Sequence, residues 1–396
     1  MKFLIVSCCA ISFISFGIRQ SQGLFLFQIN SDSQIGIGLI SFSLAIGQLL
    51  WGIIQPIASE MTRKYGEKKV LIFGLLILLL GLILTPLSIN NSFFFLLNFG
   101  VLISLGSGIC SLSILISIVQ KSVNENKKGF FSSLVTTSAS FGQFIIAPLT
   151  QLFIILFGWK LSLIFLGLLV LSFLFFCKKI GESSKEEKTI SNREILLSLK
   201  KNFFYGIKNS NFNLVCLSFF SCGFHIAFLI THLPGEINLC GLSQNVASIS
   251  ISIIGIANIL GTILVGYLND KYRSKDLLFL LYFFRALIII IYLFSPKTTI
   301  TFVIFSFFIG ITWLSTIPPT ANLIGKFYGV DKLGTMFGIS LIYHQIGAFF
   351  GAWLGGIVIL NMNSLYYMWI FDASFALIAA FLNLPIKEKK LIISNP

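Results

Sequence analysis

The chain has 396 residues, of which 56% are hydrophobic and 11% are charged, and its formal net charge at pH 7 is +14. A soluble globular protein carries roughly 25% charged residues, so the composition excludes a soluble protein and predicts one that lies largely within lipid. The positive charge does not indicate nucleic-acid binding, because the Lys and Arg residues occupy short segments between apolar runs.

Turn residues and charge clusters divide the chain into twelve apolar segments, each near the ~20 residues that a helix needs to cross a bilayer. We expect these spans, numbered 1 to 12, at residues 3–29, 35–59, 69–88, 92–120, 129–157, 159–177, 210–233, 244–269, 277–295, 299–324, 333–360 and 365–384. Too few apolar residues precede Cys8 for a signal peptide. The first segment is therefore predicted to remain as span 1.

The basic residues predict the orientation of these spans. All but four of the 28 Lys and Arg residues fall at the N-terminus, in alternate loops, in the linker after span 6 or in the tail, which all lie on one side. Lys160 and Lys297 lie in loops on the other side, and Arg19 and Arg285 lie within spans. The positive-inside rule predicts a multi-pass protein of the cytoplasmic (inner) membrane with both termini cytoplasmic.

One long polar segment divides the twelve spans into six and six. We therefore expect an N-terminal six-helix bundle at 1–177, a cytoplasmic linker at 178–209, a C-terminal six-helix bundle at 210–384 and a cytoplasmic tail at 385–396. The second half of the linker, REILLSLKKNFFYGIK, has an apolar stripe at helical spacing, which is typical of a helix at the membrane interface.

An internal repeat relates the two sets of six spans. The loop sequence RKYGEKKVL at 63–71 aligns with DKYRSKDLL at 270–278, an offset of 207. Gly142 of span 5 matches Gly347 of span 11 at an offset of 205. Several matches at nearly the same offset predict two halves built on the same six-helix plan.

The loops after spans 2 and 8 resemble the signature of the major facilitator superfamily, Gly-x-x-x-Asp-Arg/Lys-x-Gly-x-Arg/Lys-Arg/Lys. The second copy has Arg273 in place of the second glycine and otherwise matches at Gly266, Asp270, Lys271 and Lys275. The first copy has Ser59 and Arg63 in place of the first glycine and the aspartate, and matches at Lys64, Gly66, Lys68 and Lys69. The resemblance implies an all-α membrane fold of two pseudo-symmetric six-helix bundles that rock about a cavity lined by spans 1, 4, 7 and 10.

Two further stretches resemble monocarboxylate porters within that superfamily. GIRQSQGLFL in span 1 is similar to their cation-then-serine pattern, and SLIYHQIGAFFGAWLGG in span 11 is similar to bacterial members, including oxalate–formate antiporter-like proteins. The Asp–Arg pair that animal members carry in span 8 is absent from VASISISIIGIANILGTIL. The resemblance implies a secondary transporter of a small organic anion, a monocarboxylate in particular, that works by proton symport or by exchange.

Arg19 lies near the middle of span 1, where an ionisable residue is costly and therefore marks a candidate functional site. Ser12, Ser15 and Gln22 fall at helical spacing on the same side and form a polar stripe. Because a guanidinium can bind a carboxylate bidentately, we expect Arg19 and Gln22 to bind an anionic substrate. The alternative is that Arg19 caps carbonyl groups at a helix break or holds spans together.

The histidines are candidates for coupling transport to a proton. His225 in span 7 aligns with Arg19 by the repeat, and His344 lies beside Tyr343 and Gln345 in span 11. Histidine titrates near neutral pH, so both could bind substrate and a proton, or could be neutral packing residues. His232, near the far end of span 7, is expected at the surface or at a gate.

Arg285 in span 9 and Asp372 in span 12 are expected to form a structural ion pair. The resemblance makes these spans peripheral neighbours, and at ~1.5 Å per residue the two depths differ by roughly 5 Å. Either charge alone in lipid would be unfavourable. Asp372 is also predicted to be the only intramembrane acid, which leaves a positive cavity that favours anions.

Two amides and two prolines complete the candidate path. Gln48 in span 2 and Asn258 in span 8 are expected to bind either the substrate or a neighbouring helix. Pro318 and Pro319 are expected to kink or break span 10 and free backbone groups.

Other functions compete with anion transport. Export of a hydrophobic drug or metabolite is the first alternative, although GQFIIAP in span 5 lacks most glycines of the exporter motif. A polytopic enzyme is less favoured, because the sequence shows no clustered acid–base site and no phosphate-binding loop, and a ligand sensor is a further alternative. We expect no cofactor, no metal and no nucleic acid, with a small anion and the lipid bilayer as partners of a monomeric protein.

Overall fold

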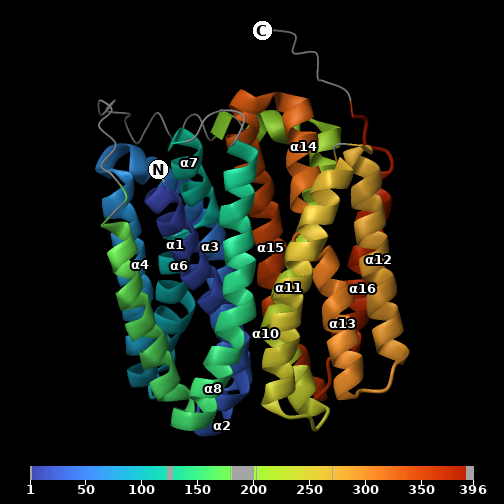
Figure 1. Cartoon of the computed structure of the whole chain (residues 1–396). Coiled ribbons are helices and arrows are strands. Elements are labelled where there is room, and N and C mark those ends of the chain that lie inside the picture. The colour runs from blue at the N-terminus through green and yellow to red at the C-terminus, as the bar shows by residue number, and fades with distance from the viewer. Residues whose placement is uncertain are drawn as a thin grey trace.

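The computed structural model describes residues 2–122, 128–178, 180, 200–201, 203–269 and 271–388. Within these residues every regular element is helical, and the helices form two bundles that lie side by side (Figure 1). The predicted all-α membrane fold is therefore confirmed.

The N-terminal bundle begins with spans 1 to 4. Span 1 consists of α1 (Lys2–Ser21), the 3-10 segment η1 (Gln22–Phe25) and α2 (Leu26–Asp32). Spans 2 and 3 are α3 (Ile37–Tyr65) and α4 (Glu67–Leu84), and the 3-10 segment η2 (Thr85–Ser88) follows. Span 4 consists of α5 (Ser92–Phe95), the π-helical segment η3 (Leu96–Leu102), α6 (Ile103–Ile109) and α7 (Leu112–Ser122).

Spans 5 and 6 together form α8 (Lys128–Cys177), in which the chain turns back at Gly158. Gly158 has φ 73° and ψ 166°, a conformation that residues with a side chain rarely adopt. Among the described residues, 11 helical stretches are long and apolar enough to cross a membrane, and one of them, Leu134–Cys177, contains both of these spans. All twelve predicted spans are therefore present.

The C-terminal bundle contains spans 7 to 12. These are α10 (Ser210–Leu239), α11 (Gln244–Asn269), α12 (Ser274–Phe294), α13 (Thr299–Thr312) with α14 (Ile317–Tyr328), α15 (Val330–Met362) and α16 (Tyr366–Asn383). Of the predicted interfacial helix, residues 200–201 and 203–207 are helical, and the rest lies outside the described residues.

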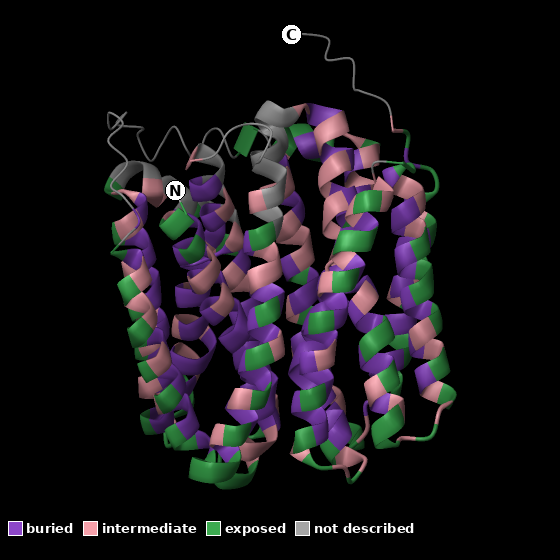
Figure 2. Cartoon of the chain, in the orientation of Figure 1, coloured by how far each residue is buried: buried purple, intermediate pink, exposed green. Residues whose placement is uncertain are grey.

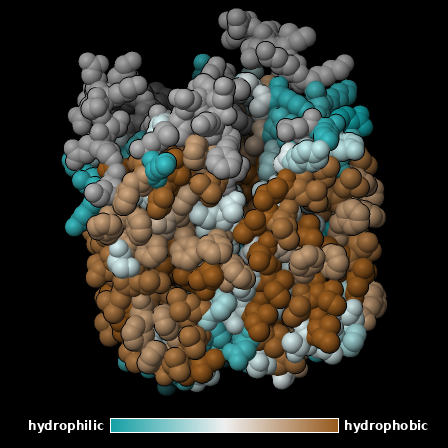
Figure 3. Space-filling view, viewed as in Figure 1, coloured by the Kyte–Doolittle hydropathy of each residue, from teal (hydrophilic) through white to brown (hydrophobic). Residues whose placement is uncertain are grey.

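The outer faces of both bundles are apolar. Buried residues face the interior, and exposed ones lie on the flanks (Figure 2), where large hydrophobic side chains such as Leu80, Ile263 and Phe294 are exposed. Hydrophilic residues lie instead toward the two ends of the molecule, at the end marked by both termini and in a patch at the opposite end (Figures 1 and 3). An apolar flank with internally bonded helices is what a bilayer requires. We call the end with the termini the terminal end and the opposite end the distal end.

The repeat found in the sequence recurs as the same helix contact in both bundles. Gly142 of α8 packs on the backbone of Phe13 in α1, and Gly347 of α15 packs on the backbone of Phe220 in α10. A Cβ atom at either glycine would overlap the facing carbonyl oxygen. Small residues let membrane helices approach this closely. Span 1 is therefore joined to span 5 in the way that span 7 is joined to span 11.

The two bundles meet along a seam that is tightly packed in its distal half. Gly23 of η1 lies against the backbone of Ile230 in α10, and a Cβ atom at Gly23 would overlap the Ile230 carbonyl oxygen. Ser41 of α3 lies against Gly356 of α15 in the same half of the membrane. These contacts close the seam at the distal end.

Candidate functional site

Spans 4 and 10 are both interrupted, at positions related by the repeat offset. In span 10, α13 ends at Thr312 and α14 begins with Pro318 in its first turn, where proline's missing N–H has no helical partner. The predicted break is therefore confirmed. Span 4, for which no break was predicted, is interrupted at Cys110 and Ser111 within the glycine- and serine-rich run GSGICSLS. Each break frees backbone carbonyl groups inside the protein.

Arg19 lies in the N-terminal bundle and is held by two residues of α3. Its Nη2 donates a hydrogen bond to Oε1 of Gln48, and its guanidinium carbon lies 4.0 Å from the centre of the Trp51 ring. The side chain is 7% exposed, and no carboxylate among the described side chains pairs with it. Gln48 and Trp51 therefore orient Arg19 but leave its charge without a counter-ion.

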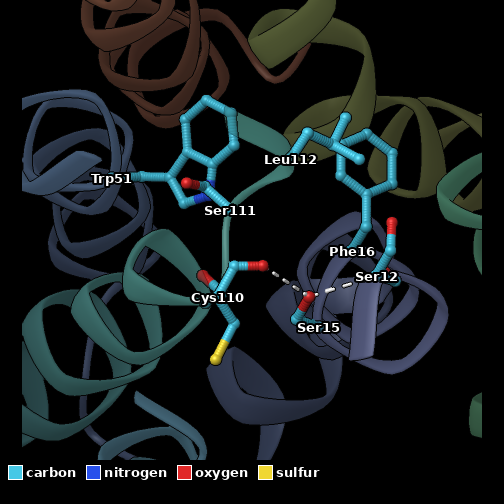
Figure 4. Close-up of a pocket in the computed structure, with 8 residues that line it drawn as sticks. Ser12, Ser15, Phe16, Trp51, Cys110, Ser111 and Leu112 are labelled. Atoms are coloured by element: carbon cyan, nitrogen blue, oxygen red, sulfur yellow. Dashed lines mark hydrogen bonds between the residues drawn. The ribbon is translucent and has the colours of Figure 1, made fainter. Parts of the chain in front are cut away.

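A small pocket lies at the break in span 4 and is lined by Ser12, Ser15, Phe16, Trp51, Ser107, Cys110, Ser111 and Leu112 (Figure 4). Trp51 stands on one side of it, opposite Phe16 and Leu112, and Trp51 also contacts Arg19. The hydroxyl of Ser15 lies 3.4 Å from the carbonyl oxygen of Cys110. The pocket therefore brings the two serines of the polar stripe predicted in span 1 to the interruption of span 4, whereas Arg19 and Gln22 do not line it.

Gln22 is the first residue of η1, three residues after Arg19 of α1. It is buried, and its Nε2 has no hydrogen-bond partner within the described chain. A buried amide is normally hydrogen-bonded. Gln22, which was itself expected to bind the substrate, therefore has a donor available.

Arg285 and Asp372 have other partners than each other, which corrects the predicted ion pair. Oδ2 of Asp372 lies 2.6 Å from Nδ1 of His225, and these side chains are 0% and 1% exposed. Nη2 of Arg285 donates to the carbonyl oxygens of Thr312 and Trp313, the second at 3.0 Å. The break in span 10 frees these carbonyls, and the C-terminal end of a helix attracts positive charge. The guanidinium of Arg285, which was predicted to pair with Asp372, therefore binds the carbonyl groups of the break instead.

His225, Asp372 and Arg285 belong to one buried polar cluster in the C-terminal bundle. Nη1 of Arg285 lies 3.5 Å from Sγ of Cys222, and the ring of Trp313 lies 5.8 Å from that of His225. Oδ1 of Asp372 and Nε2 of His225 have no hydrogen-bond partner in the described part of the chain. Cys222 and Trp313 were not predicted, because only the fold brings them to the charged residues.

The other two histidines lie outside this hydrogen-bonded pair. Nδ1 of His344 lies 3.2 Å from Nε2 of Gln345, and its ring lies 4.7 Å from that of Phe219. His232 is fully buried, with Nε2 2.7 Å from the carbonyl oxygen of Ala352. The expectation that His232 lies at a surface is therefore corrected, because the side chain is buried against the neighbouring span; its Nδ1 has no hydrogen-bond partner within the described chain.

Asn258 joins the two bundles. Its Nδ2 donates to the Ser140 hydroxyl of α8 at 2.9 Å, and its Oδ1 accepts from the Leu314 N–H in the span 10 break at 3.0 Å. Two more hydrogen bonds link the same helices, from Gln143 to the carbonyl of Ile251 and from Ser252 to that of Phe144. Of the two roles expected for Asn258, the structure shows bonding between helices.

Glu236 is a buried acid that the sequence analysis missed. Span 7 was predicted to end at residue 233, but α10 continues past Pro234, so Glu236 lies inside a span. Its Oε1 accepts a hydrogen bond from the Tyr292 hydroxyl at 3.0 Å. In the loop after α12, partial burial lowers the pKa of Lys297, and the charge of Glu236 opposes this shift. Asp372 is therefore not the only acid within a span. The mixed stretch GEINLC after Pro234 gives no clear sequence signal that the span continues.

The two motif loops differ in their backbone. Gly66 has φ 83° and joins α3 directly to α4, whereas Arg273, its counterpart in the repeat, has φ −66° and precedes α12. Because the second loop does not use a positive φ at this position, arginine replaces glycine there without strain.

The remaining motif residues are placed in part. Lys68 lies at the start of α4 and Gly266 near the end of α11. Nζ of Lys271 donates to the hydroxyl of Tyr267 and lies 4.2 Å from the centre of its ring. The side chain of Lys64 and the whole of Asp270 lie outside the described residues.

Comparison with known proteins identifies relatives along the whole chain. The family model described as Major Facilitator Superfamily matches residues 8–352 and also 215–395. An uncharacterized MFS-type transporter of Bacillus subtilis (strain 168), YcxA, is 22% identical over 349 residues, which cover 86% of this chain and 83% of the relative. Monocarboxylate transporter 12 of Rattus norvegicus is 23% identical over 338 residues, covering 76% and 68%. The crystal structure of a D-xylose-proton symporter superposes with a TM-score of 0.79 at 15% identity, covering 98% and 99%.

Proposed function

The chain belongs to the major facilitator superfamily, and we propose that, as a membrane transporter of this family, it carries a small organic anion, a monocarboxylate in particular. Transport takes place by alternating access, as proton symport or as exchange. The similarity to a protein named monocarboxylate transporter 12 supports this class of substrate, while the similarity to the xylose symporter concerns the fold alone.

The environment of Arg19 carries the proposal. Arg19 is buried in span 1 and faces an amide and an indole ring, with no carboxylate partner among the described side chains. A buried charge without a counter-ion is unfavourable, and a bound carboxylate would supply that counter-ion. Gln22, with its unpartnered Nε2, would donate a second hydrogen bond. A cationic solute would be repelled from the same place.

The other candidates take supporting roles in this proposal. Gln48 positions Arg19, and His344, which is partly exposed, is the candidate contact from the C-terminal bundle. His225 and Asn258 act through the helices that they join rather than on the anion.

The proposal includes an orientation, which rests on the distribution of the basic residues. The terminal end faces the cytoplasm, so the closed distal seam faces outward and the pocket beside Arg19 belongs to the inner half of the membrane. The bundles at 1–177 and 210–384 move as two bodies of a monomer, linked by 178–209 and followed by the tail at 385–396.

The test is uptake of labelled pyruvate, lactate, formate and oxalate by the full chain in liposomes, with and without an inward proton gradient. We expect Arg19→Gln to weaken binding of the transported anion roughly tenfold to a hundredfold, because a hydrogen bond to a charged group contributes about 1.5–3 kcal/mol. Arg19→Lys should lie in between, since it keeps the charge but loses the planar fork.

Two outcomes would contradict the proposal. If none of the carboxylates moves while a hydrophobic solute is exported, the exporter alternative replaces it. If an anion moves equally well in Arg19→Gln, Arg19 is not its binding residue.

A further inference from the structure

A buried pair of titratable side chains lies in the C-terminal bundle, whereas Arg19 lies in the N-terminal bundle. His225 of α10 and Asp372 of α16 are joined by the 2.6 Å contact between Nδ1 and Oδ2. Nε2 of His225 and Oδ1 of Asp372 each have no hydrogen-bond partner in the part of the chain that is described. Buried polar atoms are nearly always satisfied, so an acid and a base that share one hydrogen bond and keep spare atoms favour a site that gains and loses a proton.

The surrounding groups determine the charge of this site. Around the pair lie Arg285 and Tyr282 of α12, Cys222 of α10, His344 of α15 and the non-titrating Trp313 and Thr316 of the span 10 break. Arg285 is the permanent charge among them. With Asp372 ionised and His225 neutral, the cluster carries no net charge, and one added proton makes it positive.

We propose that the His225–Asp372 pair is the proton-binding site of the transport cycle and that Arg285 changes partner when the proton leaves. With the proton bound, the pair is an imidazolium and a carboxylate that neutralise each other, and Arg285 stays on the carbonyl groups of the break. When the proton passes to water, Asp372 becomes a lone buried carboxylate, which is strongly unfavourable. Arg285 is then drawn from the break toward Asp372.

The break connects this change to the seam between the bundles. Arg285 binds the carbonyl oxygens of Thr312 and Trp313, and the next N–H, that of Leu314, donates to Oδ1 of Asn258 at 3.0 Å. The amide of Asn258 donates in turn to Ser140 of the other bundle. Release of the break by Arg285 therefore alters a contact that holds the two bundles together.

The inference rests on the proposed function where it links the proton to the anion. An anion at Arg19 removes one positive charge from the buried interior, and a proton on the His225–Asp372 pair restores it. Binding the two together keeps the net buried charge constant, which low-dielectric surroundings favour. Symport of one proton with one anion follows.

The first experiment needs no substrate. Spin labels at Lys69→Cys and Tyr272→Cys report the separation of the bundles at the terminal end, with the half-buried Cys9 and Cys240 changed to serine. We expect the distance distribution of the otherwise unchanged protein to shift between acidic and alkaline pH. Asp372→Asn should abolish the shift, and His225→Gln, which retains a donor but takes no proton, should abolish it too. Glu236→Gln, the matched change at the other buried acid of this bundle, should leave it intact.

The second experiment measures accumulation of labelled lactate in liposomes. An inward gradient of one pH unit supports about tenfold accumulation by one-to-one symport, because one unit is one factor of ten in proton activity. Asp372→Asn should lower accumulation to the external concentration while lactate–lactate exchange at equal pH continues. Glu236→Gln should accumulate lactate as the parent does.

The outcomes separate the two proposals. A pH shift and proton-driven accumulation that persist in Asp372→Asn overturn the proton site and leave anion transport standing. Equal losses in Asp372→Asn and Glu236→Gln overturn it as well, since the effect would then belong to any buried acid. A pH shift that only Asp372→Asn and His225→Gln remove, in a protein that moves no carboxylate, upholds the proton site and overturns the proposed substrate.

Discussion

The interrupted spans 4 and 10 occupy equivalent places in the two bundles, yet their freed carbonyl groups are bound in different ways. In span 4, the carbonyl oxygen of Cys110 lies by a pocket and 3.4 Å from the hydroxyl of Ser15. In span 10, the carbonyl oxygens bind the guanidinium of Arg285 within a fully buried cluster. A hydroxyl adds no charge, whereas a guanidinium adds one that Asp372 must balance. The repeat therefore produced one break beside a small pocket and one closed ionic cluster.

The largest effect is expected from removing the charge that binds the span 10 break. Arg285→Leu leaves the carbonyl groups of Thr312 and Trp313 without their donor inside a buried cluster, and each buried acceptor left without a partner costs about 1–3 kcal/mol. We expect a large fall in the thermal unfolding temperature in detergent. Ser15→Ala, at the equivalent break, should lower stability by about 1 kcal/mol or less.

Arg273→Gln is the control for Arg285→Leu, because the Arg273 side chain is 68% exposed in its contact with Asp276. It should be neutral within about 0.5 kcal/mol. Parent-like unfolding of Arg285→Leu would show that the two breaks do not differ in the way described.

An intermediate effect is expected where the two bundles are alike. Gly142→Val and Gly347→Val each force a side chain against a facing backbone carbonyl, and such overpacking typically costs about 1–3 kcal/mol. Both variants should lower the unfolding temperature by similar amounts. Gly338→Val in α15 is the control, because a Cβ atom there meets open space. If the unfolding temperature fell in only one of the two variants, the two helix contacts would not be equivalent, although their sequences match.

The smallest effect concerns the aromatic residues beside the two arginines. Trp51→Leu removes a cation–π contact with Arg19, which contributes about 0.5–2 kcal/mol, so the KM of the transported anion should rise severalfold. Trp313→Leu changes the other cluster and should leave that KM unchanged while altering proton-driven accumulation. If both variants raised the KM equally, both tryptophans would act on the anion site. The assignment of the anion to one bundle and the proton to the other would then be wrong.

The spans could be predicted from the sequence because bilayer thickness sets their length and lipid sets their composition. Arg19 and His225 stood out for a similar reason, since a charge in an apolar run is visible without a structure. Span 7 was predicted too short, since it was placed at 210–233, whereas α10 continues past Pro234 and buries Glu236. Proline is tolerated within membrane helices.

The partners of the charged residues could not be predicted. Arg285 and Asp372 were paired by depth, which is visible in the sequence, but Arg285 binds backbone carbonyl groups that carry no side-chain pattern. The break in span 4 was also missed, because no proline marks it in the sequence. Partners that are main-chain atoms become visible only when the helices are placed.

The hydrogen bonds described across the seam between α8 and α11 have consequences for the surroundings in which the protein works. Gln143, Ser252 and Asn258 each donate to an uncharged oxygen atom. Dissolved ions screen interactions between charges and leave neutral hydrogen bonds nearly unchanged. The salt concentration of the medium should therefore have little effect on this part of the seam. The chain length of the lipids acts on both bundles directly, because it sets the bilayer thickness that the apolar flanks must match.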